Sequence, residues 1–337
     1  MAATFSPTEV YSLAELKQFY EEDGKLSTII EMLYEENPII QDMLLLQGNM
    51  VDGHKAKILT QLPTANFRRL YQGTARSKSG VATVKEPTRQ ISSRWEIDVD
   101  ELKLYEGTDA QSAFRLQEGR NHVEAMQQKC VDQLIYGNPE ADVDELRGLA
   151  THYAYKDGPN VIDAGGAGSD NTSIWGVCWG PKDLHGFYPK NMPAGIQHED
   201  LGRYDAFDAN GSPFRAVGDE WKWNIGFFLA DWRSVVRICN IDVSNLSITD
   251  PDGVGYVDLQ KLTIQAKNKI PSGRRNRMRW YVSESVMTAL EVQAMNRENV
   301  NLKYGEYFSS KEVLFLHGKP VFQCDAILET EAALAAM

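Results

Sequence analysis

One stretch of this 337-residue chain cannot bury itself, and this limits what the whole chain can fold into. Residues 51–97 contain few large apolar side chains, and prolines and glycines interrupt them repeatedly. The pattern predicts strands at residues 66–71 and 91–99, the second of which alternates apolar and polar side chains. A long two-stranded ribbon with so little core is only marginally stable alone. We therefore expect this segment to lie on a partner surface.

Residues 1–50 predict a second dependent segment, made of two short amphipathic helices. Ser12 and Glu15 form a capping-box pattern, in which each side chain satisfies the other's free backbone N–H. An apolar stripe at helical spacing follows, and a second stripe runs until Asn37-Pro38 stops it. A narrow apolar stripe on an isolated helix must be buried against something. We expect this segment to be an arm that docks.

The two segments carry opposite charge. Residues 1–50 hold nine acidic and two basic side chains, a net charge of −7, whereas residues 51–97 hold nine basic and three acidic ones, a net charge of +6. Such segments can pair within one chain or between copies, or they can be two solvated faces that never meet. The net charge of the whole chain is −12, which argues against a general nucleic-acid binder.

A third charged feature is the basic run at residues 272–279. It could contact phosphates, but a loop of this kind is more often solvated or paired with acids of a neighbouring chain. The side chains that we expect at contacts between copies are Arg68, Arg69, Arg76, Lys78, Lys85, Glu21, Glu22, Glu35, Glu36, Arg274, Arg275 and Arg277.

The rest of the chain predicts a mixed α+β architecture with two cores and two protruding elements. The longest helical signal covers residues 109–136 and ends at Gly137-Asn138-Pro139. Strands are predicted at residues 174–179, 186–189, 221–229, 234–243, 279–282, 313–316 and 319–323, and further helices at 257–266 and 286–295.

Motifs that carry chemistry are missing from the sequence. It has no GxGxxG, GxxxxGK[ST], GxSxG or HExxH pattern, and its four cysteines form no CxxC pair. His198-Glu199-Asp200 is the nearest acidic–histidine cluster, and we interpret it as surface hydrogen bonding because a metal needs three or four convergent ligands. We predict no catalytic, cofactor-binding or metal-binding residue and no membrane span.

Two alternatives stay open at this point. Paired carboxylates and the tryptophans at positions 175, 179, 221, 223 and 232 would suit a carbohydrate-active hydrolase, although core or interface packing is the better interpretation of these tryptophans. A structural protein without catalytic activity is the other alternative.

Four stretches carry a resemblance to a known family: residues 53–69, which lead into a ribbon that returns at 95–98; 134–149; 231–241; and 318–327. They resemble the major capsid proteins of tailed bacteriophages with the Hong Kong 97 fold, especially the podovirus epsilon 15 type. The resemblance implies an α+β capsid fold whose ranges are an N-terminal arm at 1–50, an extended E-loop hairpin at 51–97, a peripheral domain with a long spine helix at 98–150, an axial domain at 151–310 and a C-terminal return to the peripheral domain at 311–337.

The same resemblance implies a structural role and no enzymatic activity. Another virion protein, such as a decoration or portal subunit, stays open as an alternative. The chain would assemble with itself, as hexamers and pentamers, into an icosahedral shell that encloses double-stranded DNA without sequence-specific binding. Its other partners would be a separate scaffolding protein, a portal and, in some shells, a decoration protein, with no membrane involved. It would be made and assembled in the bacterial cytoplasm and end in the virion.

Overall fold

The computed structural model describes residues 38–105, 107–207, 211–247, 257–295, 302–307 and 311–336. These residues form two compact units. Unit 1 contains the described residues of 90–129 and 195–223, and unit 2 contains those of 35–89, 130–194 and 224–337. The helix α4 (Thr108–Tyr136) and the strand β9 (Pro213–Leu229) each contribute to both units. The expected helices in residues 1–37 lie outside the described residues.

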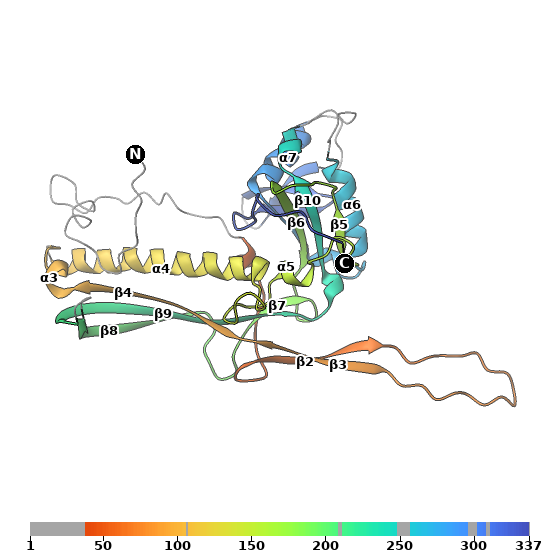
Figure 1. Ribbon diagram of the computed structural model, residues 1–337, viewed down its shortest axis with the longest axis horizontal. Coiled ribbons are helices and arrows are strands. Elements are labelled where there is room, and N and C mark those ends of the chain that lie inside the picture. The colour runs from red at the N-terminus through yellow and green to blue at the C-terminus, as the bar shows by residue number, and fades with distance from the viewer. Residues whose placement is uncertain are drawn as a thin grey trace. The chain divides into compact units, whose positions relative to one another are not determined.

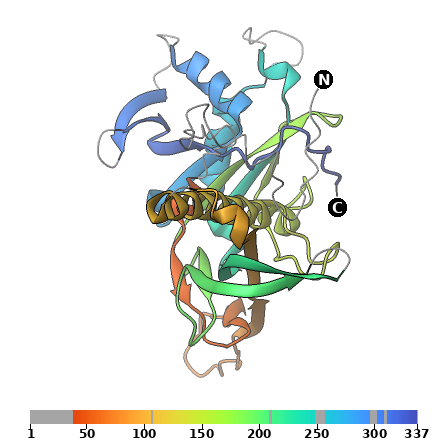
Figure 2. The ribbon, with the colours of Figure 1, turned by 90° about the vertical axis from the view of Figure 1, so that its left-hand side faces the viewer.

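Unit 1 is a helix packed on a β-ribbon. Its strands are β4 (Arg89–Asp98), β9 and β8 (Ile196–Phe207). β9 lies in the middle and pairs with β4 on one side and with β8 on the other. The α4 helix runs along one face of these strands in Figure 1, and Figure 2 shows the same helix, in yellow, over the green strands. Aromatic rings fill the space between them, with Phe114 stacked on Tyr105 at 4.5 Å and tilted against Trp95 at 5.9 Å.

The main core of unit 2 is a seven-stranded sheet in the order β12-β13-β14-β11-β6-β10-β5. Its strands are β5 (Val161–Asp163), β6 (Asn171–Cys178), β10 (Val235–Asp242), β11 (Met278–Val282), β12 (Leu302–Tyr307), β13 (Lys311–Leu316) and β14 (Lys319–Gln323). Every residue of the central β6 is buried, as expected for a strand covered on both faces. The helix α6 (Leu259–Lys269) packs on β10 and β5, and α7 (Glu284–Met295) contacts β14.

A second group of strands in unit 2 carries a hairpin. The strands β1 (Leu45–Gln47) and β7 (Leu184–Tyr188) pair in parallel, and β7 pairs antiparallel with the second half of β9. The strands β2 (Gly53–Gln61) and β3 (Gly80–Pro87) form the hairpin, a two-stranded sheet of its own. Figure 1 shows this hairpin continuing into a long loop beyond both strands. Residues 62–79 make up that loop, which we call the hairpin tip.

Most of the expected elements are confirmed, with shifts of a few residues at their ends. The expected helix at 109–136 is α4, which ends where Gly137 and Pro139 follow. The expected strand at 66–71 is wrong, because these residues lie in the hairpin tip with no strand to pair with. The expectation also missed β2 and β3 on either side of the tip, and β8 with the first part of β9.

Short helices complete the described chain: α2 (Ile39–Asp42), α3 (Val99–Leu102) and α5 (Leu149–His152). The start of α3 illustrates how the sequence sets such ends, because the Asp98 carboxylate accepts a hydrogen bond from the backbone N–H of Asp100. None of the described helices has the length and apolar character that crossing a membrane requires.

Candidate functional site

The hairpin tip presents an apolar surface that nothing in the described chain covers. Phe67 and Tyr71 are fully exposed, and Leu70 is 86% exposed. Burying a side chain of this size removes about 1.5–3 kcal/mol of unfavourable hydration. A group of such side chains in solvent therefore marks an interaction surface.

The same tip is strongly basic. Residues 62–79 include Arg68, Arg69, Arg76 and Lys78 and not one acidic side chain. All four are exposed, and within the described residues none of them forms an ion pair. Lys85 differs, because it lies in β3 and pairs with Asp52 at 2.5 Å. The structure thus brings four of the expected contact residues together on one loop and places Lys85 nearer the hairpin's origin.

The basic run at 272–279 has partners within the chain. Arg274 lies 3.1 Å from the Asp183 carboxylate and 2.7 Å from that of Asp231, and Arg277 lies 2.8 Å from Asp183. Arg275 donates instead to the backbone carbonyls of Ile270 and Asn268. Asp183 is fully buried, so the two guanidinium groups compensate a charge that could not otherwise stay there.

Asp231 shows the strength of this cluster. Burial alone would raise its pKa, but hydrogen bonds from Arg233 and the nearby charge of Arg274 outweigh burial and lower the pKa to about 2. These intrachain pairs occupy Arg274, whereas half of the Arg277 side chain is still exposed. A contact of this run with another copy stays a prediction, and so does the role of Glu21, Glu22, Glu35 and Glu36, which lie outside the described residues.

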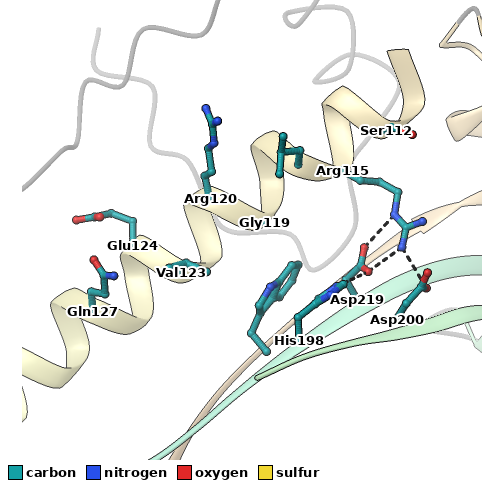
Figure 3. Close-up of a pocket in the computed structure, with 12 residues that line it drawn as sticks. Ser112, Arg115, Gly119, Arg120, Val123, Glu124, Gln127, His198, Asp200 and Asp219 are labelled. Atoms are coloured by element: carbon teal, nitrogen blue, oxygen red, sulfur yellow. Dashed lines mark hydrogen bonds and ion pairs between the residues drawn. The ribbon is translucent and has the colours of Figure 1, made fainter. Parts of the chain in front are cut away.

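Unit 1 contains a groove between α4 and the strands β8 and β9 (Figure 3). Its volume is about 720 Å³. Arg115 reaches from α4 to two carboxylates, at 2.7 Å from Asp219 and 3.1 Å from Asp200. The hydrogen bond to Asp219 is the largest of the effects that raise the pKa of Arg115. This bidentate contact fixes the helix against the ribbon at one end of the groove.

Trp221 forms the floor of the groove. The rings of His122 and His198 stack against it, at centroid distances of 4.9 and 5.3 Å. Gly119 allows the helix to approach, because a side-chain carbon there would lie 3.2 Å from the Trp221 ring. Sequence reasoning placed Trp221 in a core but missed the groove, since no local pattern predicts that residues about 100 positions apart will meet.

The arrangement offers little for catalysis. Arg115 occupies Asp200 and Asp219 beside His198, and the described residues contain no group of three or more His, Cys, Asp or Glu side chains placed to hold a metal ion. The four cysteines are buried and form no disulfide. Four of the five tryptophans considered for sugar stacking are buried, and only Trp232 is exposed. The tryptophan surface that a carbohydrate-active hydrolase would need is therefore not formed by these residues.

Comparisons with known proteins agree on one family. A family model described as major capsid protein GP7 matches residues 21–335. A chain in the cryo-EM structure of bacteriophage Epsilon15 is 28% identical, with a TM-score of 0.76 over 99% of this chain and 100% of that one. The capsid of bacteriophage JBD30 has the same fold at 10% identity, with a TM-score of 0.51 over 96% of this chain and 99% of that one. No curated protein sequence matches the chain.

Proposed function

Because the chain belongs to the major capsid protein GP7 family and is a structural protein of a phage capsid, we propose that its basic hairpin joins neighbouring copies in the shell. The expected fold class, α+β of the Hong Kong 97 capsid type, is confirmed. The expected structural, non-enzymatic role is confirmed by family membership, and with it the hydrolase alternative is set aside. The chain assembles with copies of itself and is part of the virion.

The finer assignments are part of the proposal. Residues 1–50 act as the N-terminal arm, 51–97 as the E-loop, 98–150 as the peripheral domain with the spine helix, 151–310 as the axial domain and 311–337 as the C-terminal return. The two units divide the chain differently, since residues 195–223 group with 90–129. In this proposal hexamers and pentamers tile the shell around the DNA with a scaffolding protein, a portal and, in some shells, a decoration protein, after synthesis in the host cytoplasm.

The exposed hairpin tip is the observation that carries the proposal. It combines exposed rings at Phe67 and Tyr71, whose burial would be favourable, with four cations that form no ion pair within the described residues. An interface with a buried aromatic centre and a polar rim uses both kinds of side chain. The tip is thus suited to insert into a groove with apolar walls and acidic edges.

Unit 1 offers a surface of that kind. Residues 90–129 and 195–223 together hold eight basic and 14 acidic side chains, a net charge of −6, whereas residues 51–89 hold eight basic and two acidic ones, a net charge of +6. The residues that line the groove of unit 1 include Trp221, Leu116 and Val123. They also include the acidic Glu124 and Asp200, the second of which is paired with Arg115. We therefore propose that the hairpin tip of one copy docks on unit 1 of another.

Charge reversal in the tip tests this function. Changing Arg68, Arg69, Arg76 and Lys78 to Glu should leave the subunit folded by circular dichroism but prevent the formation of shells seen by electron microscopy. The physical reason is that like charges across an interface cost several kcal/mol. A control with the three arginines changed to Lys keeps the charge and should still assemble. Normal shells from the Glu variant would show that the tip's charge has no part in assembly.

A further inference from the structure

Two histidines with incompletely hydrogen-bonded rings meet where the root of the β2–β3 hairpin packs on β7. His54 is the second residue of β2, and His185 lies in β7. Both Nδ1 atoms are buried, and neither has a hydrogen-bond partner among the described residues. His185 is only 3% exposed. A buried polar atom without a partner is costly, so a pair of them at the origin of a projecting element calls for a physical explanation.

The two rings belong to a small aromatic cluster. The centroid of His54 lies 5.8 Å from that of His185, 5.4 Å from that of Phe187 and 4.9 Å from that of Phe228. His185 also contacts Phe228, at 5.6 Å. Since Phe187 is in β7 and Phe228 in β9, His54 is the side chain through which the hairpin root packs on both strands. Rings packed in this way are stable as neutral imidazoles, because a cation there would lose its hydration.

The backbone at the root leaves no room for a larger side chain. A side-chain carbon on Gly53 would collide with the Glu86 carbonyl, and one on Gly226 of β9 would lie 2.9 Å from the Pro87 carbonyl. Close backbone contact with β9 at Gly226 thus accompanies the ring contacts at the root.

Few charged groups face the two rings. Burial lowers the pKa of His54. Burial also lowers the pKa of His185, the nearby His54 lowers it further, and a backbone hydrogen bond with Gly180 opposes both effects. Glu86 stands opposite His54 in the hairpin register, and burial raises its pKa while Arg147 lowers it.

Other charged groups next to these strands are paired. Asp183, which directly precedes β7, is paired with Arg274 and Arg277. Lys85 of β3 is paired with Asp52, which precedes β2. Residues 224–229, which form the end of β9, include no titratable side chain. The charge of the cluster is therefore set by His54 and His185, because no other charged side chain shifts the pKa of either ring.

We propose that His54 and His185 form a proton-operated hinge, which seats the hairpin root on β7 and β9 while both imidazoles are neutral and releases it when they are protonated. The hairpin's direction would then follow pH. The hinge is a property of the subunit, whereas its consequence, a hairpin freed or fixed before it meets another copy, rests on the proposed function.

The sign of the effect follows from the histidines. Their pKa is lowered in the seated state and returns to about 6.5 when the root opens. Seating is therefore fully stabilised above pH 6.5 and is weakened as the pH falls below that value. The raised pKa of Glu86 acts in the opposite direction, because its seated form keeps a proton more readily. One carboxyl opposes two imidazoles, so acidification opens the hinge.

Hydrogen–deuterium exchange of the full-length subunit between pH 7.5 and pH 5 tests the hinge. After correction for intrinsic exchange rates, amide opening at the start of β2, the end of β3 and β7 should increase as the pH falls below 6.5. The opening equilibrium can increase at most about tenfold per pH unit for each proton that is taken up on opening. A flat profile for the natural chain would overturn the proposal.

Matched variants assign the effect to the two rings. His54→Phe and His185→Phe keep an aromatic ring that cannot be protonated, and each should reduce the pH slope. Glu86→Gln removes the opposing group and should steepen it. His317→Asn is the control, since His317 is also half-buried with a lowered pKa but lies in the β13–β14 turn, and it should leave the slope unchanged. A full slope in both Phe variants would refute the hinge.

The two proposals fail in different ways. A flat exchange profile in a subunit that still needs its basic tip to assemble would refute the hinge alone. A hinge that responds to pH in a subunit whose Glu-substituted tip still forms shells would refute the docking role alone.

Discussion

Arg237 and Glu331 show how single residues hold unit 2 together. Arg237 is 3% exposed in the buried part of strand β10, and its guanidinium lies 2.9 Å from the Glu331 carboxylate. Glu331 also accepts hydrogen bonds from Ser173 and Tyr136. Burial, followed by the charge and the hydrogen bond of Glu331, raises the pKa of Tyr136 well above its ordinary value. The pair thus ties the C-terminal segment to β6, β10 and the end of α4.

Removing one partner of this pair should destabilise the subunit strongly. Glu331→Ala leaves the buried Arg237 charge without compensation, which typically costs about 3–5 kcal/mol. The measurement is the free energy of unfolding from denaturant titration of the unassembled subunit. Asp205→Ala is the control, because Asp205 pairs with Arg215 on an exposed face and should change the free energy by about 1 kcal/mol or less. Equal losses in the two variants would contradict the assigned role of burial.

Sequence reasoning could not have found this pair. Arg237 stands in a β-type apolar run, and nothing local distinguishes it from an arginine at a sheet edge. Its partner is 94 residues away in the segment that follows the last strand, β14. The same holds for Asp183 with Arg274 and Arg277. Charges that are paired through the tertiary fold become recognisable only once the strands have been placed.

At the scale of elements, the hairpin combines a well-defined ladder with an uncovered tip. The strands β2 and β3 pair from Gly53 with Pro87 to Gln61 with Gly80. Beyond them, residues 62–79 are exposed throughout. Fold stability and tip function should therefore be separable, since the tip contributes almost no buried surface to its own subunit.

Replacing residues 62–79 by Asn-Gly should keep the subunit folded and abolish assembly. A two-residue Asn-Gly turn suits an antiparallel pair, and shortening an 18-residue loop reduces the entropy lost on closure by about 2 kcal/mol. We expect the melting temperature to be unchanged or higher and the shells to disappear from electron micrographs. A Gly/Ser loop of the natural length should also fail to assemble, whereas shells from that variant would show that loop length alone is sufficient.

Elements with a strong periodic pattern were predictable, and those without one were not. The α4 helix has 29 residues, no proline and a clear stop signal, so its range follows from the sequence. The strands β2 and β3 were missed because they hold few large apolar side chains, so the apolar alternation that marks a half-buried strand is weak in the sequence. That weak alternation is itself informative, since a strand that buries little of its surface in its own subunit can bury the rest on a partner.

For the whole molecule, the distribution of charge matters more than its total. The net charge of −12 keeps the chain from binding DNA phosphates generally. Within it, residues 51–89 carry +6 and the segments that form unit 1 carry −6. This asymmetry could be read from the sequence, but the surface that receives the hairpin could not, because the segments that form it are separated by more than 60 residues. Copies of a chain with these opposite patches attract one another up to about the screening length set by the dissolved salt.

Assembly should therefore weaken as salt is added. Raising the ionic strength from about 0.1 M to about 1 M shortens the screening length from about 10 Å to about 3 Å. An exposed ion pair contributes up to about 1 kcal/mol, and the tip has four cations. A loss of about 1 kcal/mol of contact energy per subunit should raise the critical subunit concentration for shell formation about fivefold.

Light scattering against subunit concentration measures this threshold at each salt concentration. A variant with Arg68, Arg69, Arg76 and Lys78 changed to Gln should assemble only at higher concentration and show little dependence on salt, because only the apolar contacts of Phe67, Leu70 and Tyr71 then remain. If the natural chain and the Gln variant responded to salt alike, the attraction between the tip and the acidic surface would be excluded as a driving force, and the apolar rings of the tip would have to carry the contact alone.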